Sequence, residues 1–352
     1  MNPPGEIDSP GLAGVGIKKA LVTGGGGFVG RALTRRLLER GLEVVVVGRN
    51  HYHDLDQADL TQAKGDIRDR DFLVSVSRGC DTVFHVAAKA GIWGSHEEYY
   101  SINVTGTENV IAACRTNRIP RLVYTSTPSV VFRGGNLRGV DESTPYAERF
   151  LCAYAETKAM AEKGVLAANS EELKTTALRP HLIWGPGDTN LIPRLVERGR
   201  QGVLKRVGDG ENLVDISYID NVVAAHLLAA DTLAKSGAAA GRAYFISQGE
   251  PVKLWKWIDH FFAMNRIPAV NRRIGFRKAR FAGLLMESFY RLFKIEEEPP
   301  MTRFLAEQLA HSHWFSIAAA RRDLGYEPEV STPEGMRRTT EWLKISYPRL
   351  TD

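Results

Sequence analysis

Short apolar runs alternate along the first half of the chain with segments whose apolar residues recur every three or four positions. The runs read KKALVT, LEVVVVG, DTVFHV, RLVYTST and KTTALRP, at residues 18–23, 42–48, 81–86, 121–127 and 174–180. The segments between them, such as FVGRALTRRLLER, have the spacing of helices. This alternation predicts βαβ units and an α/β fold with a doubly wound parallel sheet, and a run such as VVVV suits a strand buried on both faces.

The pattern loosens after Pro180. Helical segments such as NLIPRLVERGRQG and NVVAAHLLAADTLA there alternate with short strands. We predict a sheet domain at 18–180 and a smaller, mainly helical C-terminal lobe at 181–352, from which VDISYI (214–219) and RAYFIS (242–247) return to the sheet. Residues 1–17 are rich in Pro and Gly and lack a basic start, so we expect a disordered tail and not a signal peptide.

Composition narrows the class of protein. With 43% hydrophobic and 25% charged residues in 352, the chain is neither disordered nor fibrous. The net charge of +5 is dispersed, which argues against nucleic-acid binding and suits an anionic substrate or cofactor. Three cysteines without metal-ligand spacing predict a reduced, cytoplasmic protein with no metal site, and no apolar run is long enough for a transmembrane segment.

A glycine-rich turn follows the first predicted strand. TGGGGFVG, residues 23–30, has Gly24, Gly27 and Gly30 in G-x-x-G-x-x-G spacing, with Phe28 and Val29 opening a helix. Glycines allow a tight turn and let the backbone approach a diphosphate, while the helix N-terminus stabilises its charge. A plain loop would also be rich in glycine, but the position between a strand and a helix favours a Rossmann-type dinucleotide site.

The end of the second strand bears on the choice of cofactor. A site selective for NAD usually has Asp or Glu here, which accepts hydrogen bonds from the ribose hydroxyls. This chain has Gly48 followed by Arg49. Arginine pairs with a 2′-phosphate, so we predict a preference for NADP(H) over NAD(H), the alternative being that Arg49 is an ordinary surface residue.

Two further strand ends supply candidate cofactor contacts. GDIRD (65–69) places Asp66 where it accepts a hydrogen bond from the adenine amino group and Ile67 against the ring, although Asp66 is almost as well explained as a helix cap. HVAA (85–88) ends the next strand, and the small side chains of Ala87 and Ala88 let the backbone approach the cofactor. Ordinary packing at a strand end is the competing interpretation.

The stretch YAETK (154–158) offers a candidate acid–base pair. Tyr154 and Lys158 are four residues apart and therefore share one face of a helix. A neighbouring ammonium favours the phenolate form of a tyrosine, whose usual pKa is near 10, and so brings it toward a working pH. An amphipathic helix can also place an aromatic and a lysine in this way for structural reasons.

Seven motifs occur in the order found in one large enzyme family: TGGGGFVG, GDIRD, HVAA, NVTGT, YTSTPSVVF, YAETK and LRPHLIWGPGD. Together they resemble an extended short-chain dehydrogenase/reductase of the 3β-hydroxysteroid dehydrogenase branch, over nearly the whole chain after residue 17. The resemblance implies an oxidoreductase in which Tyr154 is the general acid or base. Lys158 would be its partner and would also hold the nicotinamide ribose.

The third catalytic member in that family is a hydroxyl near the end of the fifth strand. Aligning YTSTPSVVF places Thr127 there, where serine is more common, with Ser126 as the alternative. Successive residues of a strand face opposite sides, so only one of the two can point at the substrate, and we expect Thr127. Asn103 of NVTGT is expected to support the cofactor-side strands through hydrogen bonds.

The expected substrate contacts are mostly apolar: Trp93, Val130 and Trp184, with Lys89, or Arg133, for a carboxylate and His181 for a polar contact. Nucleotide-sugar epimerases and dehydratases of the same superfamily need polar contacts for a diphosphate, so they fit less well. HVAAKAGIWGSHEEYY, YTSTPSVVF and EPPMTRFLAEQLAHSHWFS resemble bacterial reductases of 2-alkyl-3-oxoalkanoates in olefin biosynthesis. That resemblance implies reduction of a long-chain β-keto acid, with a 3β-hydroxysteroid or 4-carboxysterol dehydrogenase as the runner-up and a non-catalytic NADP sensor as the third candidate.

The segment FAGLLMESFYRLF (281–293) is markedly apolar at helical intervals. It is explained by a core helix, by a cover over a long-chain or sterol-like substrate, or by a surface that meets a partner or a membrane. The family resemblance also implies a homodimer through helices at roughly 97–116 and 153–169, and an assembly with other enzymes of the pathway. The expected location is cytoplasmic, with peripheral membrane contact as an extension.

Overall fold

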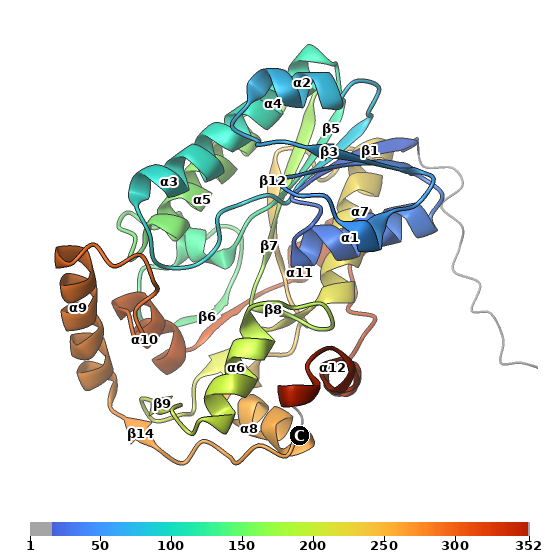
Figure 1. Cartoon of the computed structure of the whole chain (residues 1–352). Helices are drawn as coiled ribbons and strands as arrows, with labels where there is room; N and C mark the ends of the chain where they lie inside the picture. The colour runs from blue at the N-terminus through green and yellow to red at the C-terminus, as the bar shows by residue number, and fades with distance from the viewer. Residues whose placement is uncertain (1–15, 351–352) are drawn as a thin grey trace, which may run out of the picture.

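Seven parallel strands form the central sheet of the computed structural model, which describes residues 16–350 (Figure 1). Their order is β12-β7-β5-β4-β1-β2-β3, so the chain reverses direction across the sheet between β1 and β4. This is the doubly wound order that forms a crevice at the carboxyl ends of the strands. The strands are β1 (Lys19–Thr23), β2 (Glu43–Gly48), β3 (Leu60–Lys64), β4 (Thr82–His85), β5 (Arg121–Thr125), β7 (Lys174–Pro180) and β12 (Arg242–Ile246).

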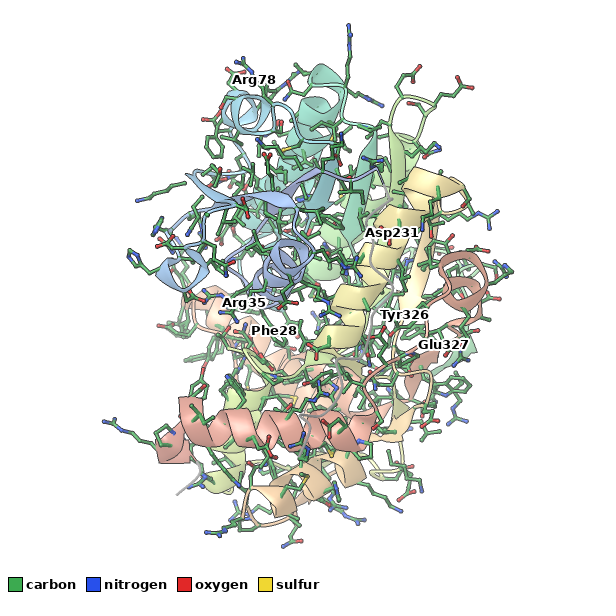
Figure 2. All side chains as sticks on the ribbon, turned by 90° about the vertical axis from the view of Figure 1, so that its right-hand side faces the viewer. Phe28, Arg35, Arg78, Asp231, Tyr326 and Glu327 are labelled. Carbon is green, nitrogen blue, oxygen red and sulfur yellow. The ribbon has the colours of Figure 1, made fainter. Side chains whose placement is uncertain are left out.

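Helices cover both faces of this sheet because successive residues of its inner strands point to opposite sides. Ala20 and Val22 of β1 pack in one apolar cluster, and Leu21 packs in the other. The first cluster contains α1 (Phe28–Glu39) and α7 (Ile219–Lys235), which lie side by side in Figure 2, where Phe28 and Arg35 mark α1 and Asp231 marks α7. The second contains α2 (Arg70–Val76), α4 (Gly106–Thr116) and α5 (Ala153–Ala167).

Most of the remaining elements form the lower part of the molecule in Figure 1. A four-stranded sheet and two two-stranded sheets lie there among the helices. Their strands are β6 (Leu137–Val140), β8 (Ile183–Trp184), β9 (Arg206–Val207), β10 (Leu213–Val214), β11 (Ser217–Tyr218), β13 (Val252–Lys253), β14 (Arg273–Ile274) and β15 (His313–Phe315). The remaining helices are α3 (His96–Tyr100), α6 (Leu191–Arg200), α8 (Leu254–Met264), α9 (Phe276–Leu292), α10 (Arg303–Ala310), α11 (Ala318–Leu324) and α12 (Thr332–Ser346). Of these, α3 packs against α5, and α11 packs against α7 and β12.

The predicted fold class is confirmed, and the five apolar runs correspond to β1, β2, β4, β5 and β7. RAYFIS also joins the sheet, as β12. VDISYI does not, because β10 and β11 pair in two of the small sheets. The helix from NVVAAHLLAADTLA was expected in the lobe, but α7 packs on the sheet because most of its surface is apolar and buried. The expected tail at 1–17 falls largely outside the described residues.

Candidate active site

The glycine turn after β1 leaves no room for side chains. Gly24 has φ +70°, and a Cβ there would come 2.8 Å from the backbone of Ala87 at the end of β4. A Cβ on Gly30 would come 2.2 Å from the Gly24 carbonyl oxygen. The amide of Gly27 donates to the same oxygen at 2.9 Å, which closes the turn. Gly24 and Gly30 are therefore required by the tightness of the turn, and their contact with a diphosphate stays a prediction.

The start of α1 has the properties of a diphosphate site. The helix begins at Phe28, and its N-cap, Gly27, provides no side-chain hydrogen bond to the first amides. These N–H groups and the positive end of the helix dipole point out of the turn, where anions bind. Across the crevice, at the end of β5, the buried hydroxyl of Ser126 has no partner among the described residues. The glycine turn with the N-terminus of α1, and the unpartnered hydroxyl of Ser126, fit the binding of a nicotinamide dinucleotide.

Tyr52 explains why no acidic residue ends β2. A Cβ on Gly48 would come 2.6 Å from the Tyr52 hydroxyl, and a Cβ on Gly26 would overlap the Tyr52 ring at 1.8 Å. The ring thus fills the space beside the glycine turn, and the Arg31 guanidinium lies 5.6 Å from its centre. Arg49 follows β2 with an exposed side chain. Arg31 pairs with Asp54 at 2.5 Å, so Arg49 is the cation at this rim of the crevice that can meet a phosphate.

Asp66 and Ile67, the expected contacts of the adenine, are both engaged with other residues of the protein. The Asp66 carboxylate accepts from the Arg68 side chain at 2.6 and 3.0 Å and from the Arg68 amide. The hydrogen bonds from Arg68 lower the pKa of Asp66, and the charge of Arg49 adds to this effect. Ile67 is 7% exposed and packs on Gly106 of α4, where a Cβ would come 2.5 Å from its side chain. Ala87 and Ala88, at the end of β4, are partly buried.

Tyr154, Lys158 and Thr127 come together at the carboxyl edge of the sheet. Tyr154 and Lys158 are one turn apart on α5, and the Lys158 Nζ donates to the carbonyl oxygen of Thr125 at 2.5 Å. The same ammonium lies 4.1 Å from the centre of the Tyr124 ring. Thr127 follows β5 as the N-cap of the 3-10 turn η3 (Pro128–Val131), and its hydroxyl hydrogen-bonds Ser129.

Burial dominates the electrostatics of this group. Desolvation raises the pKa of Tyr154 to about 12, and a hydrogen bond with Thr127 opposes the shift. Desolvation lowers the pKa of Lys158 to about 7, and the charge of Glu162 opposes it. Of the two candidate hydroxyls, Thr127 hydrogen-bonds with Tyr154 and Ser126 does not, and a role of Thr127 in catalysis stays a prediction.

Two supporting interactions were not recognised in the sequence. Glu162, one turn beyond Lys158, is fully buried and accepts from Arg179 of β7 at 2.6 Å and from the Tyr146 hydroxyl at 2.7 Å. Its spacing of four from Lys158 repeats that of Tyr154 and could have identified it. His85 is likewise buried, between the hydroxyls of Thr23 and Thr107 at 2.7 and 2.8 Å.

Asn103 performs the structural role expected of it. It lies in a π-helical stretch, Ser101–Thr105, between α3 and α4. Its side chain accepts from the Lys89 amide at 2.8 Å and donates to the Lys89 carbonyl at 3.2 Å and to the Thr157 hydroxyl at 3.1 Å. It therefore joins the segment after β4 to the helix that carries Tyr154.

A cavity of about 1090 Å³ opens beside the N-terminus of α5. Its lining reaches Cys152 and Ala153, which directly precede Tyr154. One wall is the segment 89–99, and the opposite wall is formed by α9, the segment after it and the start of α10. The aromatic and apolar side chains of the lining are Ile92, Trp93, Tyr99, Phe150, Leu151, Tyr290, Ile295 and Phe304. Charged side chains such as Glu98, Glu287 and Arg291 stand between these apolar ones, so the volume and the mixed lining suit a large molecule with both lipophilic and polar parts.

Lys89 and Trp93, two of the five expected substrate contacts, line this cavity. The Lys89 ammonium pairs with Glu98 at 2.7 Å. The Trp93 indole donates to the carbonyl oxygen of Ile295 at 3.1 Å and so connects the two walls. Arg133, the alternative to Lys89, is exposed and is not among the lining residues.

Val130, Trp184 and His181 occupy other surroundings. Val130 and Trp184 are fully buried in apolar clusters and do not line the cavity, because the side chains of η3 and β8 turn into the core. His181 is 8% exposed, and its Nε2 lies 2.7 Å from Nδ1 of His313. His313 Nε2 donates to the carbonyl oxygen of Gln308 at 2.8 Å, so Nδ1 of His313 accepts the proton of His181. Burial lowers the pKa of both histidines.

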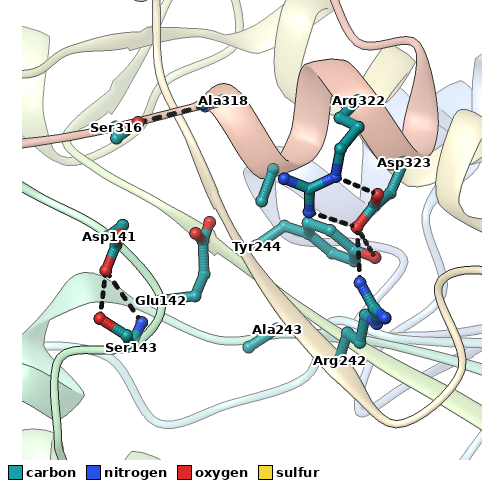
Figure 3. A pocket seen from close by; sticks show the side chains of 11 residues that line it. Asp141, Glu142, Ser143, Arg242, Ala243, Tyr244, Ser316, Ala318, Arg322 and Asp323 are labelled. Carbon is teal, nitrogen blue, oxygen red and sulfur yellow. Dashed lines mark hydrogen bonds and ion pairs between the residues drawn. The ribbon is translucent and has the colours of Figure 1, made fainter.

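A smaller hollow of about 340 Å³ lies at the amino end of β12 (Figure 3). Three of its side chains converge on Asp323, which accepts from Arg242 and from Tyr244 at 3.1 Å and also pairs with Arg322. Ligands of parallel sheets bind at the carboxyl ends of the strands. The cavity beside Tyr154 is therefore the better candidate for the active site.

Known proteins resemble this chain over most of its length. A model of the 3-beta hydroxysteroid dehydrogenase/isomerase family matches residues 21–272. The 2-alkyl-3-oxoalkanoate reductases of Stenotrophomonas maltophilia and Shewanella oneidensis are 52% and 48% identical, over 91% and 92% of this chain and 98% and 85% of theirs. The sterol-4-alpha-carboxylate 3-dehydrogenase, decarboxylating, of Mus musculus is 33% identical over 92% of this chain and 90% of its own.

A solved structure shares the fold. MoeE5 in complex with UDP-glucose and NAD superposes with a TM-score of 0.72 at 25% identity and covers 93% of this chain and 99% of that one. This neighbour binds NAD, and the glycine turn between β1 and α1 of this chain has the properties of a site for the same kind of cofactor. The chain therefore belongs to the 3-beta hydroxysteroid dehydrogenase/isomerase family, as an oxidoreductase that uses a nicotinamide dinucleotide.

Proposed function

We propose that this enzyme reduces a 2-alkyl-3-oxoalkanoate, a β-keto acid with two long alkyl chains, to the 2-alkyl-3-hydroxyalkanoate with NADPH, in long-chain olefin biosynthesis. The observation that carries the proposal is the cavity of about 1090 Å³ that reaches the residues directly before Tyr154. The apolar part of its lining, such as Trp93 and Phe304, suits alkyl chains, and Lys89, which pairs with Glu98, is the candidate partner of a carboxylate. The two bacterial relatives named for this reaction support the substrate class.

The proposed chemistry is a carbonyl reduction at C3. The bound dinucleotide supplies a hydride to the carbonyl carbon. The Tyr154 hydroxyl gives its proton to the carbonyl oxygen as negative charge develops there, and the Thr127 hydroxyl donates a hydrogen bond to the same oxygen. The Lys158 ammonium, held by the carbonyl of Thr125, stabilises the tyrosinate that remains.

Substrate rates test this assignment directly. We expect the purified protein to oxidise NADPH with 2-alkyl-3-oxoalkanoates and to show kcat/KM at least about 100-fold higher than with 3-ketosteroids, because a pocket built for one polar headgroup discriminates strongly. Loss of NADPH absorbance provides the measurement, with product identified by mass spectrometry. Reduction of the β-keto acid no faster than the enzyme-free background would refute the substrate.

A sterol dehydrogenase is the second candidate. The 33% identity with the mouse sterol-4-alpha-carboxylate 3-dehydrogenase supports it, because that substrate also combines an acid group with a neighbouring oxygen function on a large apolar body. Oxidation of a 4-carboxysterol with NADP⁺ or NAD⁺, at a rate above that of β-keto acid reduction, would favour this alternative.

The preference for NADPH is proposed from Arg49. We expect Arg49→Asp to lower kcat/KM for NADPH by at least about tenfold, because a carboxylate repels the 2′-phosphate that arginine would pair with, while kcat/KM for NADH stays the same or rises. Steady-state kinetics with both cofactors measure the change. Arg78→Asp is the matched control, since Arg78 is also exposed but lies far from Phe28 in Figure 2. The proposal would be contradicted if Arg49→Asp left the ratio of kcat/KM for NADPH to kcat/KM for NADH unchanged.

The pH profile should reflect Lys158. Tyr154, with a pKa of about 12, keeps its proton through the neutral range, whereas Lys158, with a pKa of about 7, loses its charge as the pH rises through neutrality. We therefore expect kcat/KM for reduction to fall above about pH 7, by up to about tenfold per pH unit. Lys158→Arg keeps a charge at this position and should remove the decline from any activity that remains. A flat wild-type profile between about pH 6 and 9 would exclude this role.

We further propose that the protein is cytoplasmic and forms a homodimer in which α3, α4 and α5 of the two copies are in contact. We also propose that it works at a membrane surface together with other enzymes of its pathway. Exposed Tyr100 on α3 and Met160 on α5 support the dimer surface. A substrate with two long alkyl chains partitions into bilayers, which supports the membrane surface. No helix among residues 16–350 is long and apolar enough to cross a membrane.

A further inference from the structure

One side of α9 presents large apolar side chains to solvent. Phe281, Leu285, Phe289 and Leu292 are 61%, 55%, 53% and 76% exposed. With Leu284 and Phe293 they recur every three or four residues and form one face, here termed the outer stripe: Phe281, Leu284, Leu285, Phe289, Leu292 and Phe293. A contiguous exposed patch of this kind marks a surface of association. Of the three interpretations of 281–293, a core helix is therefore excluded for this face.

The opposite side of α9 is fixed to the protein. Ala279, Gly283 and Glu287 are its buried residues, and a Cβ on Gly283 would come 2.6 Å from the backbone of Thr302. The buried Glu287 carboxylate accepts from the Arg303 side chain at 2.7–2.9 Å. These contacts hold α9 against the start of α10 at the edge of the molecule in Figure 1, and they leave the outer stripe exposed.

Positive charge accompanies the outer stripe at its N-terminal end. The exposed cations here are Arg272, Arg273, Arg277, Lys278 and Arg280. The sequence has no Asp or Glu from His260 to Met286. Arg280 is half-exposed even though it pairs with Glu307 at 3.3 Å. The exposed carboxylates Glu296 and Glu297 lie only beyond the other end of the helix. The stripe and its cations together have the properties of a helix that lies in a bilayer interface.

We propose that α9 docks the protein on an anionic bilayer. The outer stripe enters the boundary between headgroups and acyl chains, and the basic N-terminal end pairs with anionic headgroups. A second copy of the chain could also cover the apolar side chains. The run of cations without acidic residues favours a negatively charged surface instead.

The position of α9 gives such docking a consequence for catalysis, which rests on the proposed function. Glu287, Tyr290 and Arg291 of the same helix line the cavity beside Tyr154. A lipid-like substrate would thus pass from the bilayer along α9 into the cavity without crossing water.

Vesicle binding of the full chain tests the docking without any substrate. We expect the protein to co-sediment with phosphatidylcholine vesicles that contain about 30% phosphatidylglycerol, to bind neutral vesicles weakly, and to be partly released by high salt. The triple variant Phe281→Ser/Leu285→Ser/Phe289→Ser should lower the partition coefficient at least tenfold, and Arg277→Gln/Lys278→Gln should lower it severalfold on anionic vesicles only. The control Ile345→Ser removes an apolar residue that is 81% exposed on α12 and should change nothing.

The proposal is overturned if the wild-type protein does not bind anionic vesicles, or if the triple variant binds them as well as the wild type does. If the wild-type protein is a dimer that does not bind vesicles, and if the triple variant is a monomer, the outer stripe is instead a contact between two copies of the chain. Thermal midpoints and dinucleotide binding check that each variant is folded. Phe289→Trp provides a second measurement, since its fluorescence should be quenched by brominated lipids. Vesicle binding together with no turnover of β-keto acids would refute the proposed function and leave the docking intact.

Discussion

Replacing Tyr154 with phenylalanine should reduce kcat for ketone reduction by about 10²–10⁴-fold, the range that general acid catalysis contributes. The change removes only the hydroxyl that would protonate the carbonyl oxygen. The ring of Tyr154 packs edge-on against Tyr99, with centroids 6.5 Å apart, and phenylalanine preserves that contact. Stopped-flow measurement of NADPH oxidation separates the chemical step from product release.

Two controls make this result specific to proton transfer. Dinucleotide affinity, measured by fluorescence titration, should remain within about threefold of wild type, because Lys158 and the glycine turn are unchanged. Thr127→Val removes the hydrogen bond that opposes the raised pKa of Tyr154 and the proposed contact with the carbonyl oxygen, so it should also lower kcat, by about 10–10³-fold. A Tyr154→Phe enzyme with wild-type turnover would show that another group supplies the proton.

Arg179→Met should destabilise the protein by about 3–5 kcal/mol, because removing one partner of a buried ion pair leaves the other charge uncompensated. Arg179 is 3% exposed, and Glu162 is completely buried. After the substitution only the Tyr146 hydroxyl, at 2.7 Å, would still donate to the Glu162 carboxylate. Denaturant unfolding of the apoprotein, followed by circular dichroism, measures the loss where unfolding is reversible.

The double variant Arg179→Met/Glu162→Leu separates the ion pair from the packing around it. It removes both charges and should recover most of the stability, since apolar replacements of buried pairs are often neutral. Arg36→Met removes a half-exposed arginine that pairs with Glu39 on the surface of α1 and should have little effect. Equal stability of Arg179→Met and the wild type would mean that Glu162 is protonated or solvated in the folded state.

The sequence predicted the elements whose signal is local. Apolar runs such as VVVV identify strands that are buried on both faces, and the glycine spacing identifies a turn that only Gly24 and Gly30 can form. The spacing of Tyr154 and Lys158 predicted their shared helix face. β3 was not among the apolar runs because its sequence, LTQAK, is polar and forms the edge of the sheet, where residues 16–350 place a neighbouring strand on one side of it alone.

Features that depend on distant contacts could not be predicted in this way. Val130 and Trp184 lie in segments expected to border the substrate, but the direction of their side chains is set by packing against Ala159 and Phe245 or against Trp257. The walls of the cavity come from segments about 200 residues apart, as the hydrogen bond from Trp93 to Ile295 illustrates. An apolar helical stripe is usually read as facing the core, whereas the stripe of α9 faces solvent.

The division of the active site between two regions bears on how new substrates evolve in this family. Lys158 is held from within by the carbonyl of Thr125, and the charge of the buried Glu162, which pairs with Arg179, acts on it. The cavity walls at 89–99 and 287–304 contribute none of those bonds, although Tyr99 of the first wall packs against the ring of Tyr154. Loops and helices of this kind can diverge while the scaffold stays constant. Chimaeras that exchange these two segments between acid- and sterol-specific members are therefore a rational route to reductases with new substrates. Such chimaeras would keep Tyr154, Lys158 and Thr127 unchanged.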